Sequence, residues 1–197
     1  MSLPAHHILP ASTWCSPDTI GHARGLLGKF LVRRGADGRV ESRMITEVEA
    51  YDGSEDLACH ASKGRTPRTE IMFAPAGFWY VYLCYGIHEM LNLVTGPKEY
   101  PAAILIRGVQ DLNGPGRLTK AMGITRAFNG TPAGELSGLW IEDRGVVVPR
   151  GAVKATPRIG VDFAGPVWSQ KFWRFLLPKS CCRNPPGANK TTPRTFR

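Results

Sequence analysis

Two glutamates and a tyrosine occupy alternate positions near the end of a segment typical of a β-strand. Glu47, Glu49 and Tyr51 fall at every second position in the last part of the segment 40–51. Successive side chains of a strand point to opposite faces, so these three would share one face. Two carboxylates followed by a tyrosine, where a strand enters a polar loop, form a candidate chemical site. The alternative is an exposed strand face whose charges are solvated.

The polar segment that follows adds a histidine and a basic cluster. His60 lies nine residues after Tyr51, and Lys63, Arg65 and Arg68 follow it closely. A basic loop of this kind can contact phosphates, although surface loops rich in lysine and arginine are common. His60 could be a ligand, a group that contacts a base or a structural histidine.

A third group of candidate residues lies in the aromatic segment 78–84. Tyr80 and Tyr82 share one face of this predicted strand, and Tyr85 stands directly before Gly86, where the strand must end. Tyr85 would therefore lie near the tip of a hairpin, where a large aromatic side chain is costly to expose unless it has a partner. Side chains that wedge into a nucleic-acid duplex have this character. The alternative is that Tyr85 folds back onto the core.

Motifs for several other chemistries are absent from the sequence. Neither Cys59 with His60 nor Cys84 with His88 has a recognised zinc-ligand spacing. There is no phosphate-binding P-loop, dinucleotide-binding glycine motif, nucleophile elbow or deaminase motif. The segment 114–116, Gly-Pro-Gly, precedes a predicted helix whose N-terminus could hold a phosphate.

The elements that must position these residues are mainly short strands. Asp18 has the character of an N-cap, and apolar residues at helical spacing follow it up to Gly28, which predicts a short helix. A second short helix is predicted over 117–122. Strands are predicted over 30–33, 40–51, 78–84, 91–95, 102–109, 139–142, 146–148 and 173–177. Because strands mostly follow strands, we expect an α+β fold: a single domain around a mainly antiparallel, curved sheet with peripheral helices.

The composition fits one globular domain. The chain has 197 residues, of which 43% are hydrophobic and 21% are charged. No run approaches the ~18 apolar residues of a membrane span, and no signal peptide is expected in the first 14 residues. The five cysteines form no C-x-x-C pair and are odd in number, which favours a reducing compartment.

The net charge of +9 is unevenly distributed along the chain. Five basic residues and no acidic residue lie in 178–197, a segment that is also rich in proline, which leaves +4 for the rest of the chain. We therefore divide the chain into a loose lead-in over 1–13, a domain over 14–177 and a basic, proline-rich tail over 178–197. This charge is compatible with nucleic acid as a partner but does not establish it.

Taken in order, the motifs of this chain resemble those of the alkyladenine (3-methyladenine) DNA glycosylases of the non-helix-hairpin-helix type. The resemblance runs from the first predicted helix to Leu177, nearly the whole chain apart from its ends. The matching segments are 45–51, 56–60, 66–68, 72–73, 80–82, 85–86, 103–107, 114–118, 157–161 and 173–175, with Asn92. Each segment is short, but the ordered set is highly specific.

The resemblance implies a base excision repair enzyme that acts on alkylation damage. Such an enzyme flips alkylated or deaminated purines out of duplex DNA and hydrolyses the N-glycosidic bond with an activated water, leaving an abasic site. It implies a monofunctional hydrolase without a lyase step, metal or organic cofactor. The partner implied is double-stranded DNA containing damaged purines, with a monomeric enzyme and no membrane. The expected location is the cytoplasm of a bacterium, at the nucleoid when bound to DNA, or the nucleus of a eukaryote.

The resemblance also implies roles for individual residues. Glu49 matches the general base that deprotonates the attacking water, and Arg107 matches the residue that helps to hold this water. Tyr85 matches the residue that fills the gap left in the base stack, and Asn92 matches a pocket residue that disfavours guanine. Tyr51, His60 and Tyr82 match the residues that form the walls of the base pocket in the family. Phosphate contacts are expected from Lys63, Arg65, Arg68 and Arg117.

The sequence differs from the family pattern in two places, and it leaves two alternative classes of protein to consider. The connection 108–113 is shorter than in many family members, which would trim a peripheral surface, and His88 is expected in the turn beyond Tyr85 without an assigned role. A catalytically idle damage-binding protein on the same scaffold is one alternative, against which the intact Glu49 argues. A formyltransferase-like domain with a small-molecule partner is the other, against which Tyr85 and the basic loop 63–68 argue.

Overall fold

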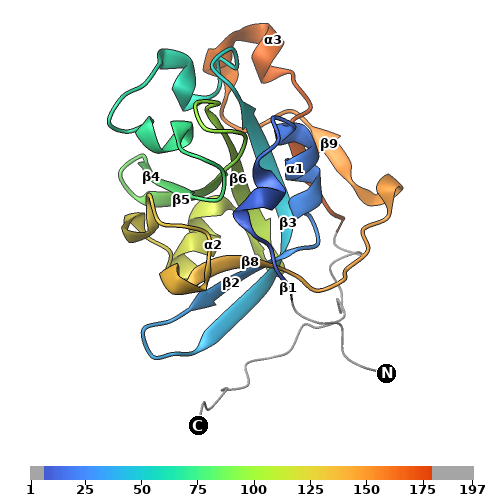
Figure 1. Cartoon of the computed structure of the whole chain (residues 1–197). Helices are drawn as coiled ribbons and strands as arrows, with labels where there is room; N and C mark the ends of the chain where they lie inside the picture. The colour runs from blue at the N-terminus through green and yellow to red at the C-terminus, as the bar shows by residue number, and fades with distance from the viewer. Residues whose placement is uncertain (1–6, 179–197) are drawn as a thin grey trace.

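An antiparallel sheet runs through the molecule (Figure 1), whose computed structural model describes residues 7–178. Its strands are β1 (His7–Ile8), β2 (Phe30–Arg34), β3 (Val40–Asp52), β4 (Trp79–Cys84), β5 (His88–Val94), β6 (Ala102–Val109), β7 (Leu112–Asn113), β8 (Leu139–Asp143), β9 (Lys154–Thr156) and β10 (Arg174–Leu176). They are ordered β1–β8–β2–β3–β6–β5–β4, with β10 paired to β3 and β9, and β7 paired to β6.

Short helices surround this sheet. The α-helices are α1 (Thr19–Leu26), α2 (Pro115–Ala121) and α3 (Gly165–Ser169). The 3-10 helices are η1 (Ala11–Trp14), η2 (His60–Lys63), η3 (Glu70–Phe73), η4 (Arg126–Phe128), η5 (Glu135–Ser137), η6 (Arg150–Ala152) and η7 (Asp162–Ala164). The side chain of Asp18 caps α1 by accepting a hydrogen bond from the Gly21 N–H at 2.8 Å. Among residues 7–178, no helix has the length and apolar character needed to span a membrane.

β3 is the longest strand and joins the two halves of the sheet. Its first half pairs with β2, whereas its second half lies between β6 and β10. The register with β6 shifts on either side of Glu47, an irregularity of the β-bulge type. Such irregularities bend a strand and increase its twist. The irregularity lies at Glu47, the first of the three residues that the sequence marks as chemical.

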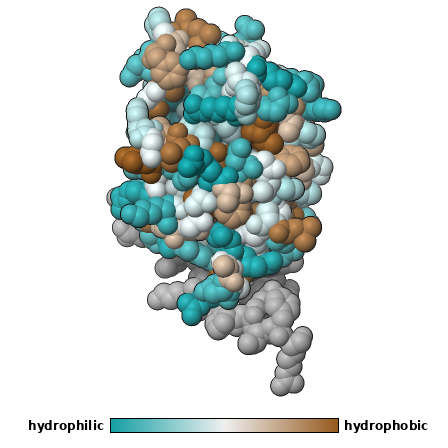
Figure 2. Space-filling model, turned by 90° about the vertical axis from the view of Figure 1, so that its left-hand side faces the viewer, coloured by the Kyte–Doolittle hydropathy of each residue, from teal (hydrophilic) through white to brown (hydrophobic). Residues whose placement is uncertain are grey.

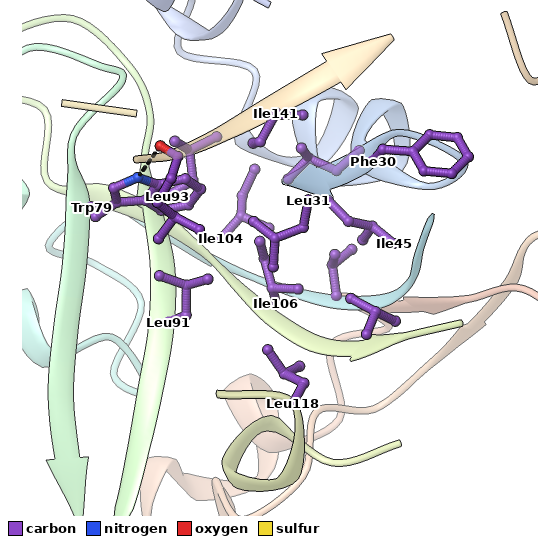
Figure 3. Packing of buried hydrophobic residues seen from close by; sticks show 14 of the residues in the cluster. Phe30, Leu31, Ile45, Trp79, Leu91, Leu93, Ile104, Ile106, Leu118 and Ile141 are labelled. Carbon is purple, nitrogen blue, oxygen red and sulfur yellow. Dashed lines mark hydrogen bonds between the residues drawn. The ribbon is translucent and has the colours of Figure 1, made fainter. Parts of the chain in front are cut away.

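One face of the sheet packs into the main hydrophobic core (Figure 3). β3, β5 and β6 contribute side chains from alternate positions, including Val48, Leu93 and Ile104, and all three are fully buried. Trp79 of β4 lies at the edge of this cluster, where its indole N–H donates to the Leu139 carbonyl at 3.0 Å. Helices α1 and α2 cover the core through residues such as Leu26 and Leu118. The opposite face of these strands does not contribute to this core and can carry polar side chains.

The predicted fold class is confirmed, because the molecule has a mainly antiparallel sheet with peripheral helices. The predicted helices and most strands lie within a few residues of their observed positions. The strand predicted over 146–148 is wrong: Val146 and Val148 pack against the core, but this stretch pairs with no strand among the described residues. Its alternation of apolar residues reflects packing rather than sheet hydrogen bonding.

The lead-in predicted over 1–13 is more regular than expected in its second part. His7 and Ile8 form β1 and pair with β8, because Ile8 and Leu9 find apolar surface at the edge of the core. A 3-10 turn follows and buries Trp14. Residues 1–6 and most of the tail, 179–197, lie outside the described residues.

Burial at the centre of this core predicts a large loss of stability for Ile104→Ala. Ile104 is fully buried between neighbouring strands, so truncation leaves a cavity and should lower the free energy of unfolding by about 2–5 kcal/mol. Leu136→Ala is the control, since Leu136 is fully exposed and should change that free energy by less than about 0.5 kcal/mol. Urea unfolding monitored by tryptophan fluorescence measures both. Equal effects of the two substitutions would contradict this assignment of the core.

Candidate active site

A row of polar and aromatic side chains crosses the face of the sheet opposite the core. Tyr80 of β4 is paired with Asn92 of β5, and Asn92 is paired in turn with Leu105 of β6. Leu105 is paired with Glu49 of β3, which is paired with Arg174 of β10. Directly opposed residues project to the same face, so five strands contribute neighbouring side chains to one surface.

A cavity of about 630 Å³ opens over this row. Its floor comes from β3–β6, and its rim comes from η2, the β4–β5 turn, the start of α2 and the segment 159–163. Most of the residues predicted for the site line it: Tyr51, His60, Arg68, Tyr82, Tyr85, Asn92, Arg107 and Arg117. Sequence positions from 51 to 117 therefore converge on one hollow of a size typical for a ligand site.

Glu49 is fully buried, lies outside the lining of the cavity and has three partners. Its Oε1 accepts a hydrogen bond from the Ile159 N–H at 2.8 Å. Its Oε2 accepts from the Tyr51 hydroxyl at 2.9 Å and from Nη1 of Arg107 at 3.4 Å. Tyr51 and Arg107 both line the cavity, so the carboxylate is linked to it through these two side chains. The alternative of a solvated strand face is wrong for Glu49.

Burial raises the pKa of Glu49 above its ordinary value. Arg107, the Ile159 N–H, the Tyr51 hydroxyl and Arg174 act in the opposite direction by stabilising the carboxylate, but the loss of hydration outweighs them. A raised carboxyl pKa brings proton affinity closer to that required of a base at neutral pH. The same burial, together with the neighbouring carboxylate, raises the pKa of Tyr51, which stays protonated as a hydrogen-bond donor.

Glu47 supports this arrangement from the adjacent position on the same face. Its Oε1 accepts from Nε of Arg107 at 3.1 Å and from Nε of Arg174 at 2.8 Å. Arg107 therefore bridges the two carboxylates through its Nε and Nη1 atoms. Two acidic and two basic groups balance one another in a part of the molecule with little solvent.

His60, Tyr80 and Tyr82 form an aromatic wall. The ring centroids of His60 and Tyr82 are 4.6 Å apart, and those of Tyr80 and Tyr82 are 5.2 Å apart. Nδ1 of His60 and the Tyr80 hydroxyl are hydrogen bonded at 2.8 Å. Burial, together with the cations Arg68 and Lys63, lowers the pKa of His60 to about 4. The imidazole is therefore neutral at physiological pH.

Asn92 lies beside this wall and is almost fully buried. Its Nδ2 donates to the carbonyls of Tyr80 and Met90 at 3.1 and 3.2 Å. Both amide hydrogens are used within the protein, so the side chain is held in one orientation.

Tyr85 projects into solvent from the turn between β4 and β5. Its side chain is 91% exposed, so the alternative in which it folds back onto the core is wrong. Tyr85 and Gly86 both have positive φ angles, 51° and 74°, and the Ile87 N–H closes the turn on the Cys84 carbonyl. Two successive positive φ angles are typical of a tight hairpin turn. A positive φ angle is uncommon for a bulky residue such as Tyr85. The expectation that His88 lies in the turn is wrong. His88 is the first residue of β5 and packs closely against Gly116.

The four predicted phosphate-binding residues are exposed but differ in their surroundings. Arg68 and Arg117 line the cavity, and the guanidinium of Arg68 lies 5.0 Å from the ring centroid of Tyr82. Arg65 is paired with Glu70 and Glu99, which offset its charge. Lys63 and Arg65 lie outside the lining of the cavity. The face seen in Figure 2 is largely hydrophilic, with its hydrophobic residues in separate small groups.

Similarity to known proteins places this arrangement in a family. A model of the methylpurine-DNA glycosylase family matches residues 13–113 and 108–181. The chain belongs to this family. It is thus a DNA glycosylase, a hydrolase of N-glycosidic bonds that acts in the repair of alkylation damage, and the formyltransferase-like alternative falls away.

Bacterial and archaeal relatives of this glycosylase are similar over most of their length. A protein of Myxococcus xanthus is 44% identical over 185 residues, covering 87% of this chain and 91% of the relative. One of Methanocella arvoryzae is 43% identical over 195 residues, covering 89% and 94%. Both are provisionally named 3-methyladenine DNA glycosylases.

The structure of the glycosylase adds residues to which the sequence analysis gave no role. Leu105 and Met72 line the cavity, and Phe163 on η7 lines it while remaining 72% exposed. Arg158 and Asp56 form a fully buried ion pair beside the site. Both lie in segments that match the family, but nothing in their spacing indicates that they meet. Among residues 7–178, no cluster of three or more His, Cys, Asp or Glu side chains could hold a metal ion.

The depressed pKa of His60 is directly measurable. We expect its imidazole to remain neutral until the pH falls to about 4, because burial and nearby cations oppose protonation. A pH series of long-range ¹H–¹⁵N NMR spectra, with His60→Gln to assign the signal, measures this. The control is the urea-unfolded chain, where the same side chain should titrate near pH 6.5. A folded-state midpoint above pH 6 would contradict the buried, neutral imidazole.

Proposed function

We propose that this glycosylase flips alkylated or deaminated purines out of duplex DNA and hydrolyses the N-glycosidic bond with a water activated by Glu49. The product is the free base and an abasic site. The observation that carries the proposal is the buried Glu49 carboxylate, joined to Arg107 and Tyr51 at the floor of an aromatic-lined cavity.

Glu49 acts as the general base in this proposal. The attacking water gives its proton to the carboxylate while its oxygen bonds to C1′ of the sugar and the bond from C1′ to the base nitrogen breaks. The 3.4 Å contact between Arg107 and Glu49 is longer than the ~2.8 Å of a close charge-assisted hydrogen bond. We place the water beside this contact, where Arg107 helps to hold it. Glu47 fixes the guanidinium and so supports the same task.

The flipped base is held by Tyr51, His60 and Tyr82. Alkylated purines are often cationic, and the faces of aromatic rings attract cations. The neutral state of His60 spares a cationic base the repulsion of an imidazolium. Asn92, fixed by its two hydrogen bonds, disfavours guanine because the exocyclic amino group of that base would crowd it.

Tyr85 fills the space that the flipped base leaves in the stack. Its exposure and its place on the rim of the cavity support this role, since a flat side chain inserted there offsets part of the cost of unstacking. Lys63, Arg65, Arg68 and Arg117 contact phosphates around the site. Arg68 and Arg117 are the better placed, because they lie on the rim and pair with no carboxylate among the described residues.

The reaction stops at the abasic site. A lyase step needs an amine that forms a Schiff base with C1′, and no lysine of residues 7–178 lines the cavity. The enzyme uses no cofactor and works as a monomer on double-stranded DNA that contains damaged purines. It acts in the cytoplasm, at the nucleoid when bound to DNA; in a eukaryote the same activity would be nuclear.

Family membership argues against the catalytically idle damage-binding protein considered from the sequence, and Glu49→Gln tests the general base of the glycosylase. The amide keeps the size of the side chain but cannot accept a proton, so lesion binding should persist and base excision should fall by at least ~100-fold. Single-turnover excision from duplexes carrying one defined lesion, followed by alkaline cleavage at the abasic site, measures this. Glu41→Gln, on the same strand but paired with Arg43 away from the cavity, is the matched control. Excision within a few-fold of wild type would move the base role, with Glu47 the next candidate.

Tyr85→Ser tests the proposed wedge. The side chain is exposed, so the melting temperature should barely change, whereas truncation of a buried aromatic residue costs about 3–5 kcal/mol. The flipped state should become less populated, which lowers excision and weakens binding to abasic DNA. A 2-aminopurine placed beside the lesion reports flipping by fluorescence, and Val147→Ser, exposed and outside the cavity lining, is the control. Normal flipping by a fully folded Tyr85→Ser enzyme would remove this role.

A further inference from the structure

A fully buried ion pair lies next to the site and has no part in the chemistry proposed so far. Nη1 of Arg158 lies 2.5 Å from Oδ2 of Asp56, and Nη2 lies 2.8 Å from Oδ1. Neither side chain has exposed surface. Two parallel hydrogen bonds of this kind fix the direction of the guanidinium as well as its position.

The same two side chains tie four segments of the chain together. Nη1 of Arg158 also donates to the Ala50 carbonyl of β3 at 2.9 Å, and Nη2 donates to the Trp168 carbonyl of α3 at 3.2 Å. Asp56 accepts from the backbone N–H groups of Asp52 and Ala58. The guanidinium carbon of Arg158 is also 4.8 Å from the ring centroid of Tyr51, whose hydroxyl donates to Glu49.

Arg158 is adjacent in sequence to the residue that donates to the inner oxygen of Glu49. The Ile159 N–H reaches Oε1 of Glu49 at 2.8 Å, and this is the only backbone donor to that carboxylate among residues 7–178. The segment 157–161 belongs to no strand. Sheet hydrogen bonds therefore do not hold the N–H in place, and the residue directly before it, Arg158, has a side chain with four hydrogen bonds.

We propose that Arg158 and Asp56 are positioning residues that hold the Ile159 N–H against Glu49 and thereby fix the orientation of this carboxylate toward the cavity. The inference rests on the proposed role of Glu49 as general base. With Oε1 occupied by the backbone donor, Oε2 is the oxygen that accepts from Tyr51 and Arg107, the two partners of Glu49 that line the cavity.

A purely structural role is the alternative, and it makes a different forecast. Buried ion pairs often add little net stability and can be replaced by neutral side chains without loss. A structural pair would therefore affect stability alone. A positioning pair also affects the protonation of Glu49, because a donated hydrogen bond favours the charged carboxylate and its loss raises the pKa.

The direction of the expected pH effect follows from the groups around Glu49. Loss of the Ile159 contact raises the pKa of Glu49, so the active carboxylate form appears only at higher pH and the acidic limb of the rate profile moves upward. The other titratable or charged groups facing Glu49 are Glu47, Tyr51, Tyr82, Arg107 and Arg174, and none of them is substituted in the test. Replacing Arg158 also removes the guanidinium that lies against the Tyr51 ring, a contact that the Ile159 variants described below leave in place.

The test is the double variant Asp56→Asn/Arg158→Met. It removes one charge of each sign, so the net charge near Glu49 is unchanged and no unpaired charge is buried. Release of 3-methyladenine from methylated DNA is followed against pH under single-turnover conditions, since this base is already cationic and leaves without being protonated. The acidic limb should move upward by about one pH unit, the effect expected when a hydrogen bond to a charged group is lost.

The matched control is Glu142→Gln/Arg144→Met, which removes another buried ion pair. This pair lies at the end of β8, and Arg144 also donates to Ser42 in the first half of β3, outside the lining of the cavity. Its loss should leave the pH profile unchanged. A shift in the control equal to that of the test variant would assign the effect to general loosening and overturn the inference.

A second pair of variants reads the N–H directly if the double variant does not fold. Ile159→Pro and Ile159→Ala both replace the isoleucine side chain at the cavity rim with a smaller one, but only proline lacks the N–H. The acidic limb of the rate profile should fall at a higher pH for Ile159→Pro than for Ile159→Ala. Coincident limbs, in an enzyme that Glu49→Gln inactivates, would overturn the positioning role, whereas full activity of Glu49→Gln would overturn the proposed general base itself.

Discussion

The pairing of β3 with β6 and β10 is the constraint on which the rest of the site depends. Val48 and Ala50 must face the core, so Glu47, Glu49 and Tyr51 must face away from it. A slip of one residue would bury the carboxylates among apolar side chains and expose the core residues. The hydrophobic effect, acting on residues to which we assign no chemical role, thus sets the direction of the groups to which we assign one. The same holds for the neighbouring strands, whose apolar positions alternate with the lining of the cavity.

Burial on that face would be prohibitive for the two carboxylates without compensating charges. Arg107 and Arg174 supply them, and backbone and hydroxyl donors satisfy the remaining lone pairs of Glu49. The arginine contacts are unevenly shared between the two carboxylates, because Glu47 has two of them and Glu49 has one. Glu49 keeps one long contact to a cation and the larger loss of hydration, so its pKa rises. Two chemically identical side chains, two positions apart, therefore have different surroundings, and for Glu49 these surroundings raise the pKa.

The sequence alone predicts much of this arrangement, and its failures have identifiable causes. Alternation gave the shared face of Glu47, Glu49 and Tyr51, and turn chemistry gave the β4–β5 hairpin. Spacing could not decide between solvation and burial, because that depends on segments far along the chain, such as 157–161, which cover Glu49. The pairing of Arg158 with Asp56 spans 102 positions and leaves no periodic trace. The strand predicted at 146–148 failed because apolar alternation reports which side is buried and not whether a partner strand is available.

The turn that presents Tyr85 has a consequence for how quickly DNA can be searched. Two positive φ angles and a closing hydrogen bond leave the backbone of this hairpin few other shapes, so the aromatic ring is already displayed before any DNA arrives. In the role that we propose for Tyr85, no loop would then have to be ordered at each encounter, and the entropy of ordering would be absent from the barrier to probing a base pair. In the proposed role, the time spent at an undamaged step is then set by the opening of the base pair rather than by motions of the enzyme. A stiff hairpin thus suits a protein that must reject intact base pairs far more often than it finds a damaged one.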